Sequence, residues 1–113
     1  ISIFEIHGTD DPVNWYEGDP TGEGGWGAYR GIEEGIDFWK STNDLSQQES
    51  ASLPDTDPSD GSNITFERHW STDSDIEVWL YRVHGGGHDW PGDEGNMDID
   101  SSESVWSFFA RNL

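Results

Sequence analysis

The sequence predicts an α/β fold in which parallel strands are flanked by helices. Three observations lead to this prediction. The chain opens with ISIFEIH (1–7), apolar on both faces as in a buried parallel strand. A segment with helical spacing follows, and a second strand (76–84) leads into a closing helix (100–113). Alternating strands and helices are typical of α/β architecture, and 113 residues suffice for one domain.

The elements along the chain are predicted from local patterns. Residues 8–28 are rich in Gly, Asp and Pro and are expected to form a loop. Apolar residues at helical spacing predict a helix from Tyr29 to about Asn43. The polar, proline-containing segment 44–63 is expected to be a long surface loop. ITFERHW (64–70) and IEVWLYRVH (76–84) predict an inserted hairpin strand followed by a core strand.

The closing helix has a recognisable start. Asp100, with Glu103 three positions later, resembles a capping box. The expected apolar face comprises Val105, Trp106, Phe109 and Leu113. Two core strands are too few to cover both faces of a sheet, so we expect a piece of a larger sheet. Ile1 begins directly inside a strand, which also favours a segment upstream.

The composition excludes several function classes. The chain has 24 acidic and 5 basic residues, a net charge of −19, which repels phosphate backbones and anionic lipid. We therefore expect no nucleic-acid partner and no membrane partner. Seven Trp, five Phe and three Tyr indicate a folded chain rather than a disordered one. Without cysteine, disulfides and thiolate metal sites are excluded.

The candidate catalytic residues follow the two predicted core strands. Asp10 and Asp11 come after the first strand, and His88 comes after the last. Ligands of open α/β sheets bind at the carboxyl ends of the strands, so an acid and a histidine are expected to meet there. An Asp that accepts the Nδ1 proton of a His leaves Nε2 free as a general base. This arrangement is two-thirds of a hydrolase triad.

Four segments resemble successive motifs of a known family. They are HGTDDPVNWYEG, GIDFWKSTN, VWLYRVHGGGHDWPG and SVWSFF, and they are similar to the polyhydroxybutyrate depolymerase and feruloyl esterase branch of the α/β-hydrolases. The resemblance implies that residues 1–113 are the carboxy-terminal portion of one α/β-hydrolase domain. It implies a secreted, extracellular or periplasmic serine carboxylesterase without a cofactor, with Asp11 as triad acid and His88 as triad base. Asn14 and Trp15 depart from the family's usual Val and Pro.

The nucleophile of such an enzyme has no counterpart in the sequence. No G-x-S-x-G occurs, and Ser62 has neither the glycine spacing nor a preceding strand. We therefore expect this chain alone to be inactive, with an amino-terminal half carrying the serine as its partner. The substrate would be a polyester or an acylated polysaccharide.

Two tryptophans are predicted to bind substrate. Trp15 lies in the loop that carries Asp11, and Trp90, also a core candidate by position, follows His88. Aromatic rings stack well on apolar or aryl acyl groups.

No metal site is predicted. His84 and His88 are separated by glycines that forbid the helix a metal pair would need. DTDPSDGSNITFE resembles a calcium loop with its glycine displaced, so a turn is favoured over a loose Ca²⁺ site at Asp55, Asp57 and Asp60.

Two other interpretations stay open. The chain can be a noncatalytic acidic module that binds a partner or Ca²⁺. Its negative charge and the absence of a G-x-S-x-G motif favour this interpretation. It can also persist by self-association through the exposed edge of its first strand.

Overall fold

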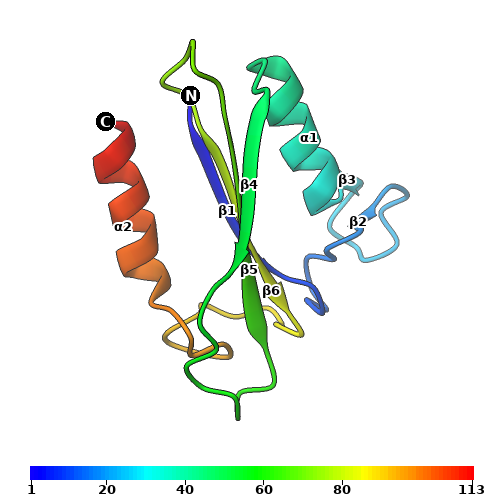
Figure 1. Cartoon of the computed structure of the whole chain (residues 1–113). Helices are drawn as coiled ribbons and strands as arrows, with labels where there is room; N and C mark the ends of the chain where they lie inside the picture. Colours follow the sequence, from blue (N-terminus) through cyan, green and yellow to red (C-terminus); the bar gives the residue numbers. More distant parts are fainter.

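The computed structural model describes all residues, 1–113. The elements in chain order are β1 (Ile3–Gly8), β2 (Gly18–Asp19), β3 (Tyr29–Arg30), α1 (Ile32–Thr42), β4 (Gln47–Ser52), β5 (Asn63–Trp70), β6 (Val78–His84) and α2 (Ser101–Asn112). Four strands form one sheet in the order β1-β6-β5-β4, and β2 pairs with β3 in a separate short ribbon. The two helices lie on opposite faces of the sheet (Figure 1). Neither helix has the length and apolar character needed to cross a membrane.

The expected parallel α/β sheet, and with it the carboxy-terminal fragment of an α/β-hydrolase fold, is wrong for this chain. The sheet is mixed: β1 pairs with β6 in parallel, whereas β6 with β5 and β5 with β4 are antiparallel. The physical reason lies in β4, whose six residues QQESAS are all exposed. Backbone pairing with β5, not burial, makes this segment a strand, so its side-chain pattern carries no strand signal.

The hairpin of β5 and β6 is confirmed, with register from Asn63 opposite His84 to His69 opposite Val78. β6 is an interior strand, between β1 and β5, and its side chains alternate between the two faces of the sheet. Val78 and Leu80 are fully buried toward α1, where Ile36 and Leu45 complete the core cluster. Burying side chains of this size contributes about 1.5–3 kcal/mol each.

The opposite face holds an aromatic cluster beneath α2. The ring of Phe4 lies 4.8 Å from that of Tyr81, and the ring of Trp79 lies 5.1 Å from those of Phe66 and Phe108. Edge-to-face pairs of this kind add about 0.5–1.5 kcal/mol beyond burial. This cluster docks α2 onto β1 and β6.

Both helices differ in detail from the prediction. α1 begins at Ile32 because Tyr29 and Arg30 pair with β2 as a strand. The start of α2 is confirmed, since Asp100 accepts a hydrogen bond from the Glu103 amide. Its expected apolar face is wrong. Phe108 is buried at 2% exposure, whereas Trp106, Phe109 and Leu113 are 68%, 54% and 99% exposed.

Candidate functional site

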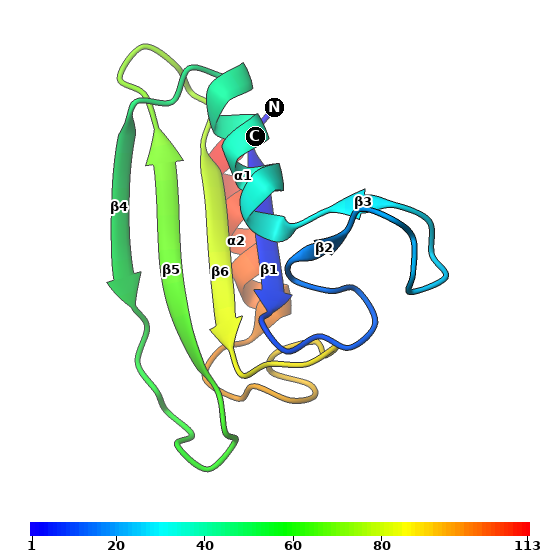
Figure 2. The same ribbon diagram turned by 90° about the vertical axis from the view of Figure 1, so that its right-hand side faces the viewer.

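The loops that follow β1 and β6 lie at the same end of the sheet, because these two strands are parallel neighbours (Figure 2). Their backbones are bonded to each other. The Thr9 amide donates to the Val83 carbonyl at 2.9 Å, and the Asp10 amide donates to the Gly86 carbonyl at 2.9 Å. The Gly85 amide in turn donates to the Thr9 hydroxyl at 2.9 Å. The two loops therefore form one connected unit.

Glycine makes this close approach feasible at two positions. A Cβ added to Gly8 would lie 2.3 Å from the Gly86 carbonyl oxygen, well inside van der Waals contact. Gly85 has φ +78°, in the left-handed region that glycine adopts without a Cβ penalty. Only Gly at these positions lets the second loop turn back over the first and carry His88 toward Asp11.

Asp11 and His88 meet at this edge. The Nδ1 of His88 lies 3.0 Å from Oδ2 of Asp11. The Asp11 carboxylate is buried, at 5% exposure, whereas the His88 ring is 58% exposed. The other oxygen of the Asp11 carboxylate, Oδ1, accepts hydrogen bonds from the amides of Val13 at 2.8 Å and Asn14 at 2.9 Å. The carboxylate is therefore fixed by its own loop before it meets the histidine.

The environment of Asp11 favours its ionised form. Burial pushes the pKa of this carboxyl upward, but the hydrogen bond to His88 and the amides of Asn14 and Val13 outweigh burial and lower the pKa below its usual range. An ionised carboxylate can only accept, so Nδ1 of His88 carries the hydrogen of their bond. In the neutral ring Nε2 is then unprotonated, and it can take a proton from a hydroxyl group.

A second imidazole lies beside the same carboxylate. His7, the penultimate residue of β1, is buried, with Nε2 2.8 Å from the Asn14 carbonyl and 3.5 Å from Oδ2 of Asp11. The sequence alone predicts only that His7 packs at the end of its strand and forms a hydrogen bond with nearby backbone. Its other ring nitrogen, Nδ1, lies 3.2 Å from Oε1 of Glu5. Strand alternation puts Glu5 and His7 on one face, and this is the sequence signal that could have revealed the pair.

The indole N–H groups of Trp15 and Trp90 both donate hydrogen bonds to nearby protein oxygens. Trp15 is half-buried and donates from Nε1 to the Pro12 carbonyl at 3.2 Å. Trp90 is 51% exposed, which excludes it from the core, and it donates from Nε1 to the Ser102 hydroxyl at 3.2 Å. Their ring faces, not their N–H groups, are what they can offer to a ligand.

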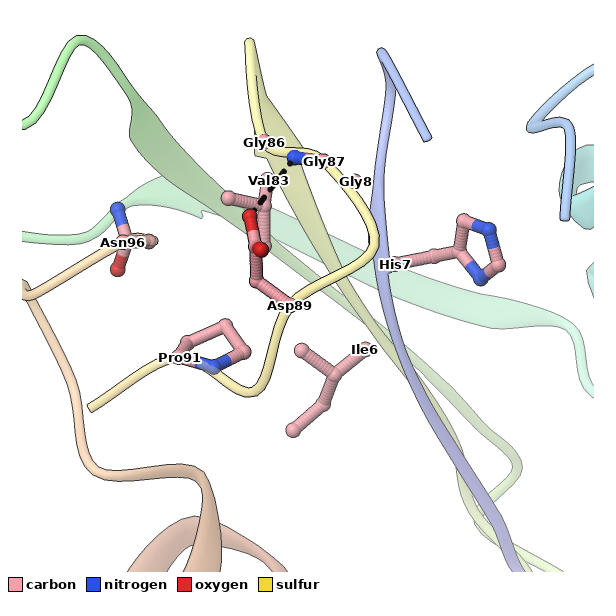
Figure 3. A pocket seen from close by; sticks show the side chains of 9 residues that line it. All are labelled: Ile6, His7, Gly8, Val83, Gly86, Gly87, Asp89, Pro91 and Asn96. Carbon is pink, nitrogen blue, oxygen red and sulfur yellow. Dashed lines mark hydrogen bonds between the residues drawn. The ribbon is translucent and has the colours of Figure 1, made fainter. Parts of the chain in front are cut away.

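A small hollow lies behind the loop that follows β6 and carries His88. It has a volume of about 10 Å³ and is lined by Ile6, Gly8 and Asp89, among others. Figure 3 shows the Asp89 carboxylate directed at the Gly87 amide, from which it accepts a hydrogen bond of 3.2 Å, while the His7 side chain points away on the other side of β1. A space of this size holds about one water molecule. It is too small to be a substrate cleft.

Two of the three acidic residues of the suggested calcium loop, Asp57 and Asp60, accept local hydrogen bonds. Asp60 accepts from the amides of Ser62 and Met97, each at 2.7 Å, and Asp57 accepts from the Ser59 amide at 3.1 Å. No group of three or more His, Asp or Glu side chains in the structure is arranged to hold a metal ion.

The comparisons with known proteins add no assignment, since no family model matches the chain and no curated protein matches its sequence.

Proposed function

We propose that this chain supplies the Asp–His pair of a serine carboxylesterase whose nucleophilic serine lies outside these 113 residues. The observation that carries the proposal is the 3.0 Å contact between Nδ1 of His88 and Oδ2 of Asp11, with Nε2 of an exposed ring left open. A buried, ionised acid that orients an exposed imidazole is the acid–base half of a catalytic triad.

The proposed reaction transfers an acyl group in two steps. Nε2 of His88 takes the proton of the serine hydroxyl while the serine oxygen attacks the ester carbonyl carbon. The resulting imidazolium, stabilised by Asp11, gives that proton to the leaving alcohol as the bond between carbonyl carbon and alcohol oxygen breaks. Water then attacks the acyl-enzyme by the same route, which releases the acid and restores the serine.

The substrate class rests on the sequence motifs HGTDDPVNWYEG and GGGHDWPG, which resemble those of polyhydroxybutyrate depolymerases and feruloyl esterases. We assign to the enzyme a polyester or an acylated polysaccharide as substrate and a secreted location. The rings of the half-buried Trp15 and the exposed Trp90 are assigned to binding its acyl or aryl groups.

The test uses the longer chain that includes the residues encoded upstream, assayed on a simple aryl ester. Asp11→Asn and His88→Ala should each lower kcat/KM by roughly 10³-fold or more. Asp10→Asn is the matched control, because Asp10 is the exposed neighbour of Asp11 and accepts a side-chain bond only from Thr9, at 3.3 Å. Near-normal activity of both triad variants would overturn the proposal.

A further inference from the structure

His7 has hydrogen-bond acceptors at both of its ring nitrogens. Nδ1 lies 3.2 Å from Oε1 of Glu5, and Nε2 lies 2.8 Å from the carbonyl oxygen of Asn14. The side chain is 8% exposed, so water does not replace either partner. A carbonyl oxygen and an ionised carboxylate can only accept. Both ring nitrogens must therefore donate, and a histidine that donates from both nitrogens is an imidazolium.

The groups that pack around His7 are compatible with a positive charge. Its strand neighbour Arg82 on β6 is also a cation. However, Arg82 donates from Nε to the Tyr16 hydroxyl and to Oε1 of Glu33 on α1, each at 2.8 Å, so its charge is paired. The ring of Tyr16 lies 6.0 Å from that of His7. The remaining charges that face His7 are the carboxylates of Glu5 and Asp11, both negative.

We infer that His7 is a buried imidazolium and a positioning residue for Asp11. It acts on Asp11 in two ways. Its bond to the Asn14 carbonyl holds the peptide chain whose amide donates to Oδ1 of Asp11. Its charge lies 3.5 Å from Oδ2, the oxygen that also accepts from His88. This effect on Asp11 is a property of the chain by itself, whereas its effect on turnover rests on the proposed esterase function.

The charge of His7 should keep Asp11 ionised. The pKa of His7 is raised, first by the hydrogen bond to Glu5, then by the Asn14 carbonyl and the charges of Glu5 and Asp11, against the opposing effect of burial. The interaction between two charged groups is reciprocal. If the Asp11 carboxylate favours protonated His7, then protonated His7 must favour ionised Asp11 to the same extent, in addition to the larger effects of His88 and of the Asn14 and Val13 amides.

The first experiment reads the charge of His7 in the chain as it stands. Long-range proton–nitrogen NMR of labelled histidines should show both nitrogens of His7 protonated at pH 7. Glu5→Gln should lower the pKa of His7 by about one unit, because it removes the first partner of Nδ1. Glu49→Gln removes an equal charge from the far edge strand β4 and should leave this pKa unchanged. A neutral His7 at pH 7, or equal shifts in both variants, would overturn the inference.

The second experiment reads the effect on Asp11. Carboxyl carbon-13 titration should show the pKa of Asp11 rising in His7→Gln, since Gln can donate to Asn14 but carries no charge. If His7 has only a structural role, the pKa of Asp11 should be the same in His7→Gln as in the wild type. That result would refute the inference. If His7→Gln does not fold, the titration of His7 in Glu5→Gln alone decides whether His7 is charged.

Activity of the longer chain separates this inference from the proposed function. In a working esterase, His7→Gln should move the acidic limb of the rate–pH profile to higher pH, because a cation near the acid–base pair has been removed. If esterase activity proves independent of Asp11 and His88, the proposed function fails, while the two NMR titrations still decide the role of His7.

Discussion

His88 and Asp11 are 77 positions apart in the sequence, yet Nδ1 of one lies 3.0 Å from Oδ2 of the other. The contact depends on three supports that are independent of any substrate. These are the parallel pairing of β1 with β6, the glycines between the two loops, and the amides that fix the Asp11 carboxylate. Each support can be tested on the isolated chain.

Asp11→Ala should destabilise the fold at neutral pH. The variant loses hydrogen bonds from the Val13 and Asn14 amides and from His88, and bonds to a charged group are worth about 1.5–3 kcal/mol each before relaxation. The pKa of Asp11 is lowered in the folded state. Its stabilisation is therefore present above the unfolded pKa near 4 and is lost as pH falls through the folded pKa. Urea unfolding at pH 7 and at pH 3 should show a difference from wild type that shrinks at the lower pH.

His7→Gln should show the opposite dependence on pH. The folded pKa of His7 is raised above its ordinary value of 6.5. Its stabilising effect is fully present below that value and is lost as pH rises through the folded pKa. The free energy of unfolding of wild type should therefore exceed that of the variant most clearly near pH 6 and least near pH 9. A gap that widens toward alkaline pH would contradict the raised pKa.

Gly8→Ala should disrupt the contact between the two loops. The new Cβ would lie 2.3 Å from the Gly86 carbonyl oxygen, and backbone on both sides cannot move away cheaply. We expect a loss of about 2–4 kcal/mol, within the range of strongly destabilising substitutions. Gly35→Ala in α1 is the matched control, because nothing lies within 4 Å of its added Cβ. That change should stabilise the helix by about 0.5–1 kcal/mol. Thermal unfolding of the two variants measures both effects.

Phe108→Ala should cost much more stability than Phe109→Ala. Phe108 is 2% exposed and contacts the aromatic cluster, whereas Phe109 is 54% exposed. Truncating a buried Phe costs about 3–5 kcal/mol, and an exposed neighbour should cost less than about 1 kcal/mol. Denaturant midpoints of the two variants provide the comparison. Equal losses would contradict the packing of α2 through Phe108 alone.

The parts of the fold that burial dictates could be predicted from the sequence. β1, β5 and β6 carry apolar or alternating side chains, and Asp100 marks the start of α2 by its own chemistry. β4 could not be predicted, because its side chains are exposed and its strand form comes from a distant backbone partner. This omission contributes to the wrong fold class, since β4 adds a second antiparallel pair to the β5–β6 hairpin and leaves β1–β6 as the single parallel pair.

The site was predictable to the same extent. The motifs around Asp11 and His88 named two residues that the structure brings together. The contribution of His7 could not be found in the same way, because it depends on the position of the Asn14 carbonyl. The path of a loop backbone cannot be read from the types of its residues. Likewise, the buried face of α2 differs from the expected one by about one position, which sheet contact decides and helix periodicity does not.

The meeting of backbones at Gly8 and Gly86 has a consequence for how this protein can change over generations. Neither loop can gain, lose or enlarge a residue at that point unless the other loop changes with it. Variation in length should therefore accumulate elsewhere, as in the tip joining β2 to β3, where a Cβ built at Gly25 or Gly27 has nothing within 4 Å.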